Sequence, residues 1–128
     1  MQLKGNVVLY HGTDGAKLKE ILSNGLVPSR RGHTKGLIFL TTNLEEAEEY
    51  ARQGGEAVGC RVKEHNPVVL KVSLPLHWII KEWKNNNVWS PFLHPKYWKW
   101  DREDIDNFNK LGVIEISKRI PAKYLEVM

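Results

Sequence analysis

Four short apolar runs constrain how this chain can fold. Each is preceded by glycine or asparagine, and none approaches the ~18 consecutive apolar residues of a membrane-spanning helix. Short runs rich in valine, isoleucine and leucine beside turn-forming residues are typical of strands. The runs are Asn6–Tyr10, Leu37–Thr41, Pro67–Ser73 and Val113–Ser117. The sequence therefore predicts a fold built on several short strands.

Two segments between these runs have the spacing of helices. The first ends at Gly25, and its apolar residues follow the i, i+3, i+4 pattern at Leu18, Ile21 and Leu22. The second begins after Asn43, which is followed three residues later by Glu46 in the pattern of a capping box. This pattern predicts a helix over 44–52. Strands, a few helices and long loops together predict a mixed α+β fold.

The segment 76–109 has no clear periodicity, and we expect most of it to be irregular. It contains all five tryptophans, and the acidic cluster Asp101–Asp106 predicts one short helix near its end. The tryptophans have two interpretations. Either they fill the core, which we expect for Trp78, Trp83 and Trp89, or they recognise a partner by stacking. Recognition is the interpretation we carry forward for Trp98 and Trp100, which lie beside lysines.

Composition limits the class of protein. A length of 128 residues predicts a single domain over 1–128. The only cysteine, Cys60, excludes an internal disulfide and any multi-cysteine zinc site, and no metal site is expected. The first residues lack the pattern of a signal peptide, so a cytoplasmic protein without a membrane partner is expected. A formal net charge of +4 permits a polyanionic partner without requiring one.

Several polar residues have a structural and a functional interpretation. His11 ends the first run beside Gly12, where a rigid strand positions a side chain and glycine allows close approach of a ligand. Thr41 and the following threonine either cap the next helix or offer hydroxyls to a ligand. The loop around Arg31 is either solvated or suited to phosphate. Glu115, within an apolar strand, lies either on an exposed edge or in a cleft, because unpaired burial is unfavourable.

These motifs resemble the ADP-ribosyltransferase fold. The similar segments are Tyr10-His11-Gly12-Thr13, Asn24-Gly25-Leu26 and Phe39-Leu40-Thr41-Thr42. The resemblance covers most of the chain and is nearest to the transferase half of the RNA 2'-phosphotransferases. Poly(ADP-ribose) polymerases follow their second-motif tyrosine with a small residue eight positions on and a stacking tyrosine eleven on. The corresponding residues after Phe39 are Ala47 and Tyr50.

The resemblance implies two small, mainly antiparallel sheets with a few short helices around a cleft for NAD. It implies that His11 is a catalytic residue that hydrogen-bonds the adenosine ribose, and that the Gly12 backbone holds the nicotinamide amide. Tyr50 would stack on the nicotinamide ring. The supporting residues of the NAD site would be Thr13, Arg31, Phe39 and Thr41.

The sequence departs from the family pattern at two motif positions. The second motif residue, usually tyrosine or histidine, is Phe39. The third, a catalytic glutamate in many transferases, corresponds either to Glu115 by strand pattern or to Leu111 by ungapped counting from Tyr124. Because the sequence begins a few residues before the first strand, we do not expect the winged-helix half with which phosphotransferases hold RNA.

Three functions are consistent with these features. The first is an NAD-dependent mono-ADP-ribosyltransferase that releases nicotinamide and modifies a protein or nucleic-acid acceptor, as small toxin-like or phage-borne modifiers do. The second is a stand-alone relative of the NAD-dependent RNA 2'-phosphotransferases. The third is a non-catalytic module that binds a partner through the tryptophan-rich segment. Neither the acceptor nor the oligomeric state follows from the sequence.

Overall fold

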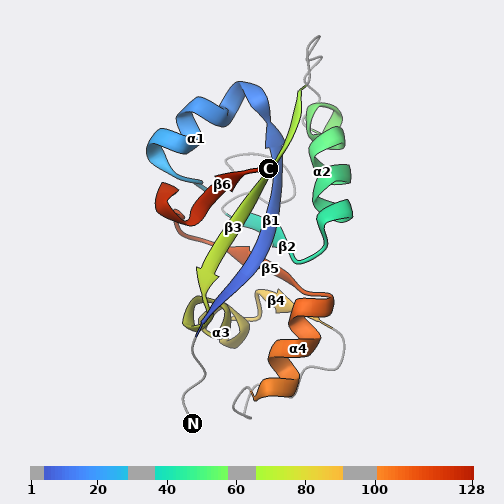
Figure 1. The fold of residues 1–128 in the computed structure, drawn as a ribbon, viewed down its shortest axis with the longest axis vertical. Coiled ribbons are helices and arrows are strands. Elements are labelled where there is room, and N and C mark those ends of the chain that lie inside the picture. The colour runs from blue at the N-terminus through green and yellow to red at the C-terminus, as the bar shows by residue number, and fades with distance from the viewer. Residues whose placement is uncertain (1–4, 29–36, 58–65, 91–100) are drawn as a thin grey trace.

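The strands form one six-stranded antiparallel sheet in a computed structural model that describes residues 5–28, 37–57, 66–90 and 101–128 (Figure 1). The strand order is β4-β5-β2-β1-β3-β6. The strands are β1 (Asn6–Asp14), β2 (Ile38–Thr41), β3 (Pro67–Pro75), β4 (Val88–Trp89), β5 (Val113–Ile116) and β6 (Leu125–Val127). All four predicted runs are therefore strands, and the mixed α+β class is confirmed.

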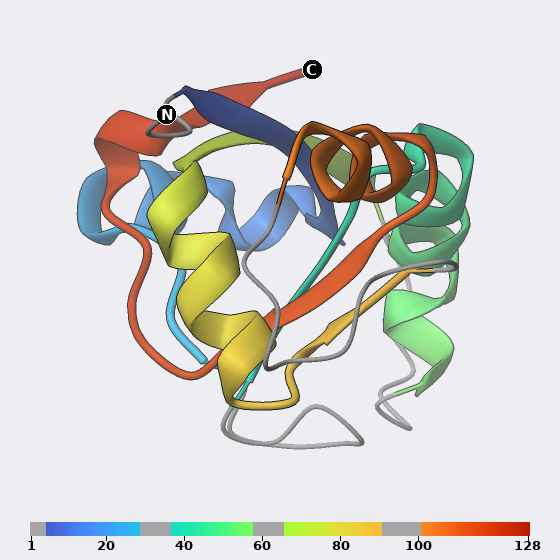
Figure 2. The same cartoon turned by 90° about the horizontal axis from the view of Figure 1, so that it is seen from below.

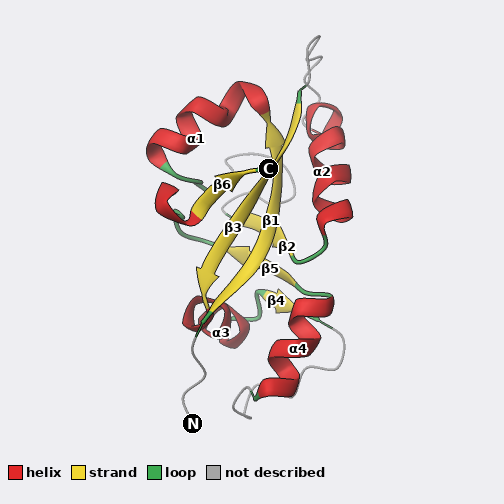
Figure 3. Cartoon of the chain, viewed as in Figure 1, coloured by secondary structure: helices red, strands yellow, loops and turns green. Residues whose placement is uncertain are grey.

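Four α-helices and two short 3₁₀ turns accompany the sheet in the described part of the chain (Figure 3). The helices are α1 (Leu18–Asn24), α2 (Leu44–Ala57), α3 (Leu76–Lys84) and α4 (Arg102–Lys110), and the turns are η1 (Gly15–Lys17) and η2 (Ala122–Tyr124). None of the helices in these ranges has the length and apolar character needed to cross a membrane.

The expectation of two separate sheets is wrong for the described strands, which form a single sheet with a narrow junction. Strand β1 pairs with β3 along its whole length, from Asn6 opposite Pro75 to Asp14 opposite Pro67. By contrast, β1 and β2 are in register at one Cα pair, Tyr10 opposite Thr41. The sheet is therefore continuous at this pair. On either side of it, β1 separates from β2, and with them the half formed by β1, β3 and β6 separates from the half formed by β2, β5 and β4.

The main core lies on one face of the sheet. Alternate side chains of the strands point to that face, where α1 and α3 cover them. The buried residues there include Leu9, Leu40, Leu70, Val72, Ile114 and Ile116 from strands and Ile79 and Trp83 from α3. Helix α2 covers the opposite face through Ala47 and Ala51, so α2 and α3 lie on opposite sides of the sheet (Figure 2).

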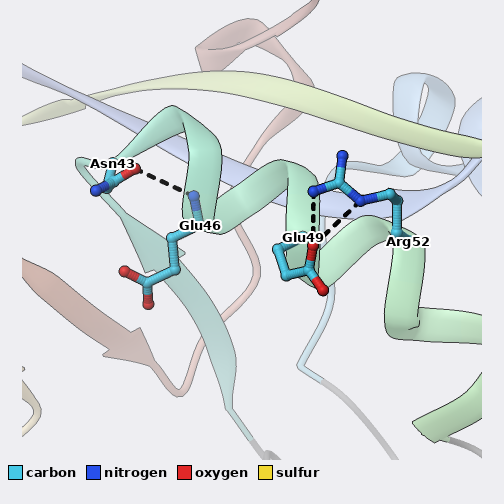
Figure 4. Close-up of polar contacts among 4 residues, drawn as sticks. All are labelled: Asn43, Glu46, Glu49 and Arg52. Carbon is cyan, nitrogen blue, oxygen red and sulfur yellow. Dashed lines mark hydrogen bonds and ion pairs between the residues drawn. The ribbon is translucent and has the colours of Figure 1, made fainter.

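Side-chain caps determine where helices α2 and α4 begin. The Glu46 N–H donates to Asn43 Oδ1 at 3.1 Å, as the capping pattern predicts, and α2 then runs beyond the predicted end at residue 52 to Ala57 (Figure 4). At α4, Asp101 and Asp104 form a complete capping box with two bonds of 3.0 Å. The helix predicted at the acidic cluster is therefore confirmed.

The expectation that most of 76–109 is irregular is wrong. This segment contains α3, β4 and most of α4. Helix α3 follows β3 directly because Pro75 ends the strand and precedes the first helical residue, a position that tolerates a proline. The three asparagines at 85–87 then form the turn into β4, where Asn86 adopts the left-handed conformation at φ 67°. Leu76, Ile79 and Trp83 have the i, i+3, i+7 spacing of a helix face, which the prediction of an irregular segment overlooks.

Candidate functional site

The candidate site lies where β1 and β2 diverge. Strand β1 continues to Asp14, so His11 lies within the strand rather than at its end. Its Nδ1 is 2.8 Å from the Phe39 carbonyl oxygen on β2. Because a carbonyl only accepts, Nδ1 carries the hydrogen and Nε2 of the neutral ring is an acceptor. His11 thus links the two strands just beyond their one registered pair.

The environment of His11 favours the neutral imidazole. Burial lowers the pKa of His11 below its ordinary value of 6.5, and the positive charge of Lys17 lowers it further. The hydrogen bond to the Phe39 carbonyl acts in the opposite direction but does not compensate for burial. A neutral ring near pH 7 keeps Nε2 available to accept a hydrogen bond from a hydroxyl group.

The depressed pKa predicts a pH dependence of stability. Above about pH 6.5 His11 is neutral in both the folded and the unfolded chain. Below that value the unfolded chain binds a proton more readily, so the free energy of unfolding falls by up to about 1.4 kcal/mol per pH unit until the folded state also protonates. Urea unfolding of the wild type and His11→Asn between about pH 8 and 5 measures this term. Identical pH profiles for the two proteins would contradict it.

The backbone of Gly12 faces the same divergence. Gly12 lies opposite Val69 on β3. The Val69 carbonyl accepts a hydrogen bond from the N–H of Met128, the residue after β6, at 3.1 Å, so the polar backbone groups of Val69 point away from β1. In an antiparallel ladder both polar groups of a residue point to the same neighbour. Gly12 therefore directs its N–H and C=O toward β2, as Tyr10 does at its pairing with Thr41.

The glycine itself is required by α2. A Cβ at Gly12 would overlap the Ala47 carbonyl oxygen and lie 2.7 Å from the Ala51 nitrogen. The sequence predicts close approach of a ligand at this glycine. The structure shows close approach of a helix, and it also brings Ala47 and Tyr50 of that helix beside β1 and β2.

Phe39 and Tyr50 form a stacked aromatic pair. Their ring centroids are 5.2 Å apart with an interplanar angle of 20°, and Tyr50 is 40% exposed. The sequence spacing predicts these residues in one site, and the structure brings them together. Beyond Tyr50 on α2, the Arg52 guanidinium donates to Glu49 at 2.6 Å and 3.2 Å (Figure 4).

Glu115 lies beside this aromatic pair. It is opposite Phe39 in the β2–β5 register, and directly opposed residues of an antiparallel pair share one face of the sheet. Glu115 is half-buried between the buried Ile114 and Ile116. Leu111 is instead the residue that ends α4, outside β5. The strand position next to Phe39 is therefore occupied by Glu115.

The two threonines act within the turn after β2. Thr41 is fully buried, and its hydroxyl accepts from the Asn43 N–H at 3.1 Å. Thr42 accepts from the Gly112 N–H at 2.8 Å and donates its own N–H to the Gly112 carbonyl at 2.9 Å. The Thr41 bond is the local turn expected from the capping interpretation, whereas the Thr42 bonds join this turn to Gly112 before β5. Thr13 is half-buried near the end of β1, and no contact with another described residue assigns it to the site.

Other predicted residues are separated from this site or are not described. Arg31, Trp98, Trp100 and Cys60 lie outside the described residues. Trp83 is in the core as expected, and Trp78 packs against it. The expectation is wrong for Trp89, which is 59% exposed because β4 is an edge strand.

A cavity of about 210 Å³ between α2 and β3 was missed by sequence reasoning. It is lined by Glu48, Ala51, Arg52, Pro67 and Val69. No local motif marks it, since it depends on how α2 packs over β3. Ala51, which packs against Gly12, is one of the residues that line the cavity. The cavity is therefore next to the candidate site, with α2 as their shared wall.

No protein-family model matches the chain, and a search of curated proteins finds no significant match.

Proposed function

We propose that this protein is an NAD-dependent mono-ADP-ribosyltransferase that modifies a macromolecular acceptor, a protein or a nucleic acid. The observation that carries the proposal is the position of Glu115 opposite Phe39, whose ring stacks on Tyr50. An aromatic pair binds a flat heteroaromatic ring, and a carboxylate beside it stabilises positive charge that develops next to that ring. Nicotinamide bound to a reacting ribose presents both features.

The Phe39 and Tyr50 rings must separate before the nicotinamide ring of NAD can lie between them. A ring between Phe39 and Tyr50 needs two stacking distances, roughly 7 Å between the outer rings, because aromatic atoms approach to about 3.5 Å. The present separation is 5.2 Å. Tyr50 is on the solvent side of the pair and 40% exposed, so a rotation of its side chain opens the stack without moving the buried core. The residues therefore fit nicotinamide once Tyr50 has moved.

The divergence of β1 and β2 supplies complementary polar groups. The Gly12 N–H and C=O both point toward it, and together they match the carbonyl and amino groups of a primary amide such as nicotinamide. His11 Nε2 accepts a hydrogen bond from a ribose hydroxyl while Nδ1 remains bonded to the Phe39 carbonyl. These groups orient the ligand without carrying charge.

Glu115 is the residue we propose for catalysis. NAD supplies an electrophilic ribose carbon when its bond to nicotinamide breaks. The Glu115 carboxylate would accept a hydrogen bond from the ribose 2'-hydroxyl and stabilise the oxocarbenium-like charge, or accept the proton of the incoming nucleophile. Half-burial of Glu115 strengthens this effect compared with a fully solvated carboxylate.

Replacing Tyr50 with alanine tests NAD recognition. We expect the change to weaken NAD binding by roughly 5- to 150-fold, since stacking of one heteroaromatic ring contributes about 1–3 kcal/mol. Titration calorimetry with NAD measures the loss. Tyr50→Phe keeps the ring and serves as the matched control, with affinity close to that of the wild type. Equal affinity of the Tyr50→Ala variant and the wild type would contradict the proposed ring site.

Nicotinamide release and phosphate transfer separate the related functions. Purified protein incubated with NAD is expected to release nicotinamide, measured by chromatography. Incubation of the protein with NAD and a 2'-phosphorylated oligonucleotide is expected to leave the phosphate in place. Removal of the phosphate would identify a 2'-phosphotransferase instead, and NAD binding without any nicotinamide release would identify a binding module.

A further inference from the structure

A continuous group of cationic and aromatic side chains lies at the N-terminal end of α3 and the η2 turn. The Lys118 ammonium is 4.0 Å from the centre of the Trp78 ring, and Trp78 meets Tyr124 edge-on at 5.6 Å. Lys123 Nζ lies 5.1 Å from the centre of the Tyr124 ring. We call these four residues the basic–aromatic cluster. They come from two segments distant in sequence, α3 and the stretch 118–124.

The rings of the cluster are fixed and its cations are exposed. Trp78 and Tyr124 are half-buried and pack against the main core. Lys118 and Lys123 are exposed, and neither pairs with a carboxylate among the described residues. Cation–π contacts of this kind hold an ammonium near one position while leaving it hydrated and available. The cluster therefore presents two partly ordered positive charges without internal neutralisation.

Charge is unevenly distributed between the two sides of the sheet. Exposed cations extend the cluster at Lys81, one turn along α3 from Trp78, and at Arg119, which donates to the Asn24 carbonyl at 2.8 Å. On the opposite side, α2 exposes four glutamates at positions 45, 46, 48 and 49. Such segregation produces a positive potential over one face that attracts a polyanion.

We propose that the basic–aromatic cluster binds the phosphate backbone of a single-stranded nucleic acid. The two ammonium groups, held over the ring faces, can contact neighbouring phosphates of a flexible strand without reading its bases, as the electrostatic part of sequence-tolerant single-strand binding does. An anionic membrane is the other polyanion that such charge attracts. Two lysines alone bind anionic lipid weakly, and stable attachment adds an apolar side chain that inserts beside the cations, whereas Trp78 and Tyr124 are packed against the core. The proposal is independent of NAD and of the site between β1 and β2.

The test is binding of a fluorescein-labelled single-stranded RNA of about 20 nucleotides, longer than the ~4–16 nucleotides of a typical single-strand site. Fluorescence anisotropy without NAD, at about 50 to 200 mM salt, gives the affinity and its salt dependence. We expect the wild type to bind, and the double variant Lys118→Gln/Lys123→Gln to bind at least roughly tenfold more weakly. The slope of log affinity against log salt should fall by about 1.4, which corresponds to two lost phosphate contacts.

A charge-matched variant separates local contacts from net charge. Arg102→Gln/Lys110→Gln also removes two exposed cations, both on α4, and should bind RNA as the wild type does. The same loss of affinity in both double variants would overturn the proposal, as would a wild type that does not bind the RNA. Binding to vesicles containing anionic lipid together with no RNA binding would also overturn it. Circular dichroism confirms that each variant is folded.

Discussion

Replacing Gly12 with alanine is expected to lower the free energy of unfolding by about 3 kcal/mol. The added Cβ would overlap the Ala47 carbonyl oxygen and lie 2.7 Å from the Ala51 nitrogen. Both are backbone atoms of α2, so the clash cannot be relieved by rotating a side chain. The helix must move away from β1, and the packing of Ala47 and Ala51 is lost. Urea unfolding at neutral pH measures the change.

Gly15→Ala is the matched control for this stability measurement. A Cβ there would lie 2.6 Å from the Asn66 side-chain nitrogen, which is the far end of a flexible side chain. We expect that variant to lose less than about 1 kcal/mol because Asn66 can rotate away. Equal losses for the two variants would contradict the close packing of α2 on β1. Displacement of α2 should also weaken NAD binding in Gly12→Ala, because Tyr50 lies on this helix.

Replacing Glu115 with glutamine is expected to reduce kcat for nicotinamide release by roughly 10²–10³-fold with little change in KM. Glutamine keeps the size of the side chain but not its charge. If the carboxylate acts on charge that develops during bond cleavage, ground-state binding of NAD is nearly unaffected. Steady-state rates measured over a range of NAD concentrations separate kcat from KM.

Glu126→Gln provides the charge-matched control for the kinetic experiment. Glu126 is an exposed carboxylate on β6, at the other edge of the sheet from β4, and it should be replaceable without loss of rate. A Glu115→Gln variant that releases nicotinamide at the wild-type rate would exclude Glu115 from catalysis. An increase in KM at constant kcat would instead assign Glu115 to substrate binding.

The sequence predicts the elements whose signals are local. The apolar runs at Asn6–Tyr10 and Pro67–Ser73 identify β1 and β3, and Asn43 with Glu46 identifies the start of α2. The resemblance implies that Phe39 and Tyr50 share a site, and they stack because a short turn joins β2 and α2. In each of these cases neighbouring residues determine the geometry, so little tertiary information is needed.

Features that depend on tertiary packing could not be predicted. Helix α3 is an exception, since Leu76, Ile79 and Trp83 have the i, i+3, i+7 spacing of a helix face and were recognisable from the sequence. The role of Gly12 depends on which helix crosses β1. The choice between Glu115 and Leu111 depended on the register of β5 with β2, which no local pattern specifies. Strand register is a non-local property, and a shift by one residue would have turned Glu115 to the other face.

The most direct measurement of the proposed function is transfer of label from NAD to a macromolecule. NAD labelled in its adenylate phosphate is incubated with purified protein and a cell lysate, and the labelled products are separated by gel electrophoresis. We predict that the wild type labels at least one macromolecule, that Glu126→Gln does so equally, and that folded Glu115→Gln and His11→Ala variants do not. Labelling that is unchanged in both of the latter variants would contradict ADP-ribosyl transfer at this site.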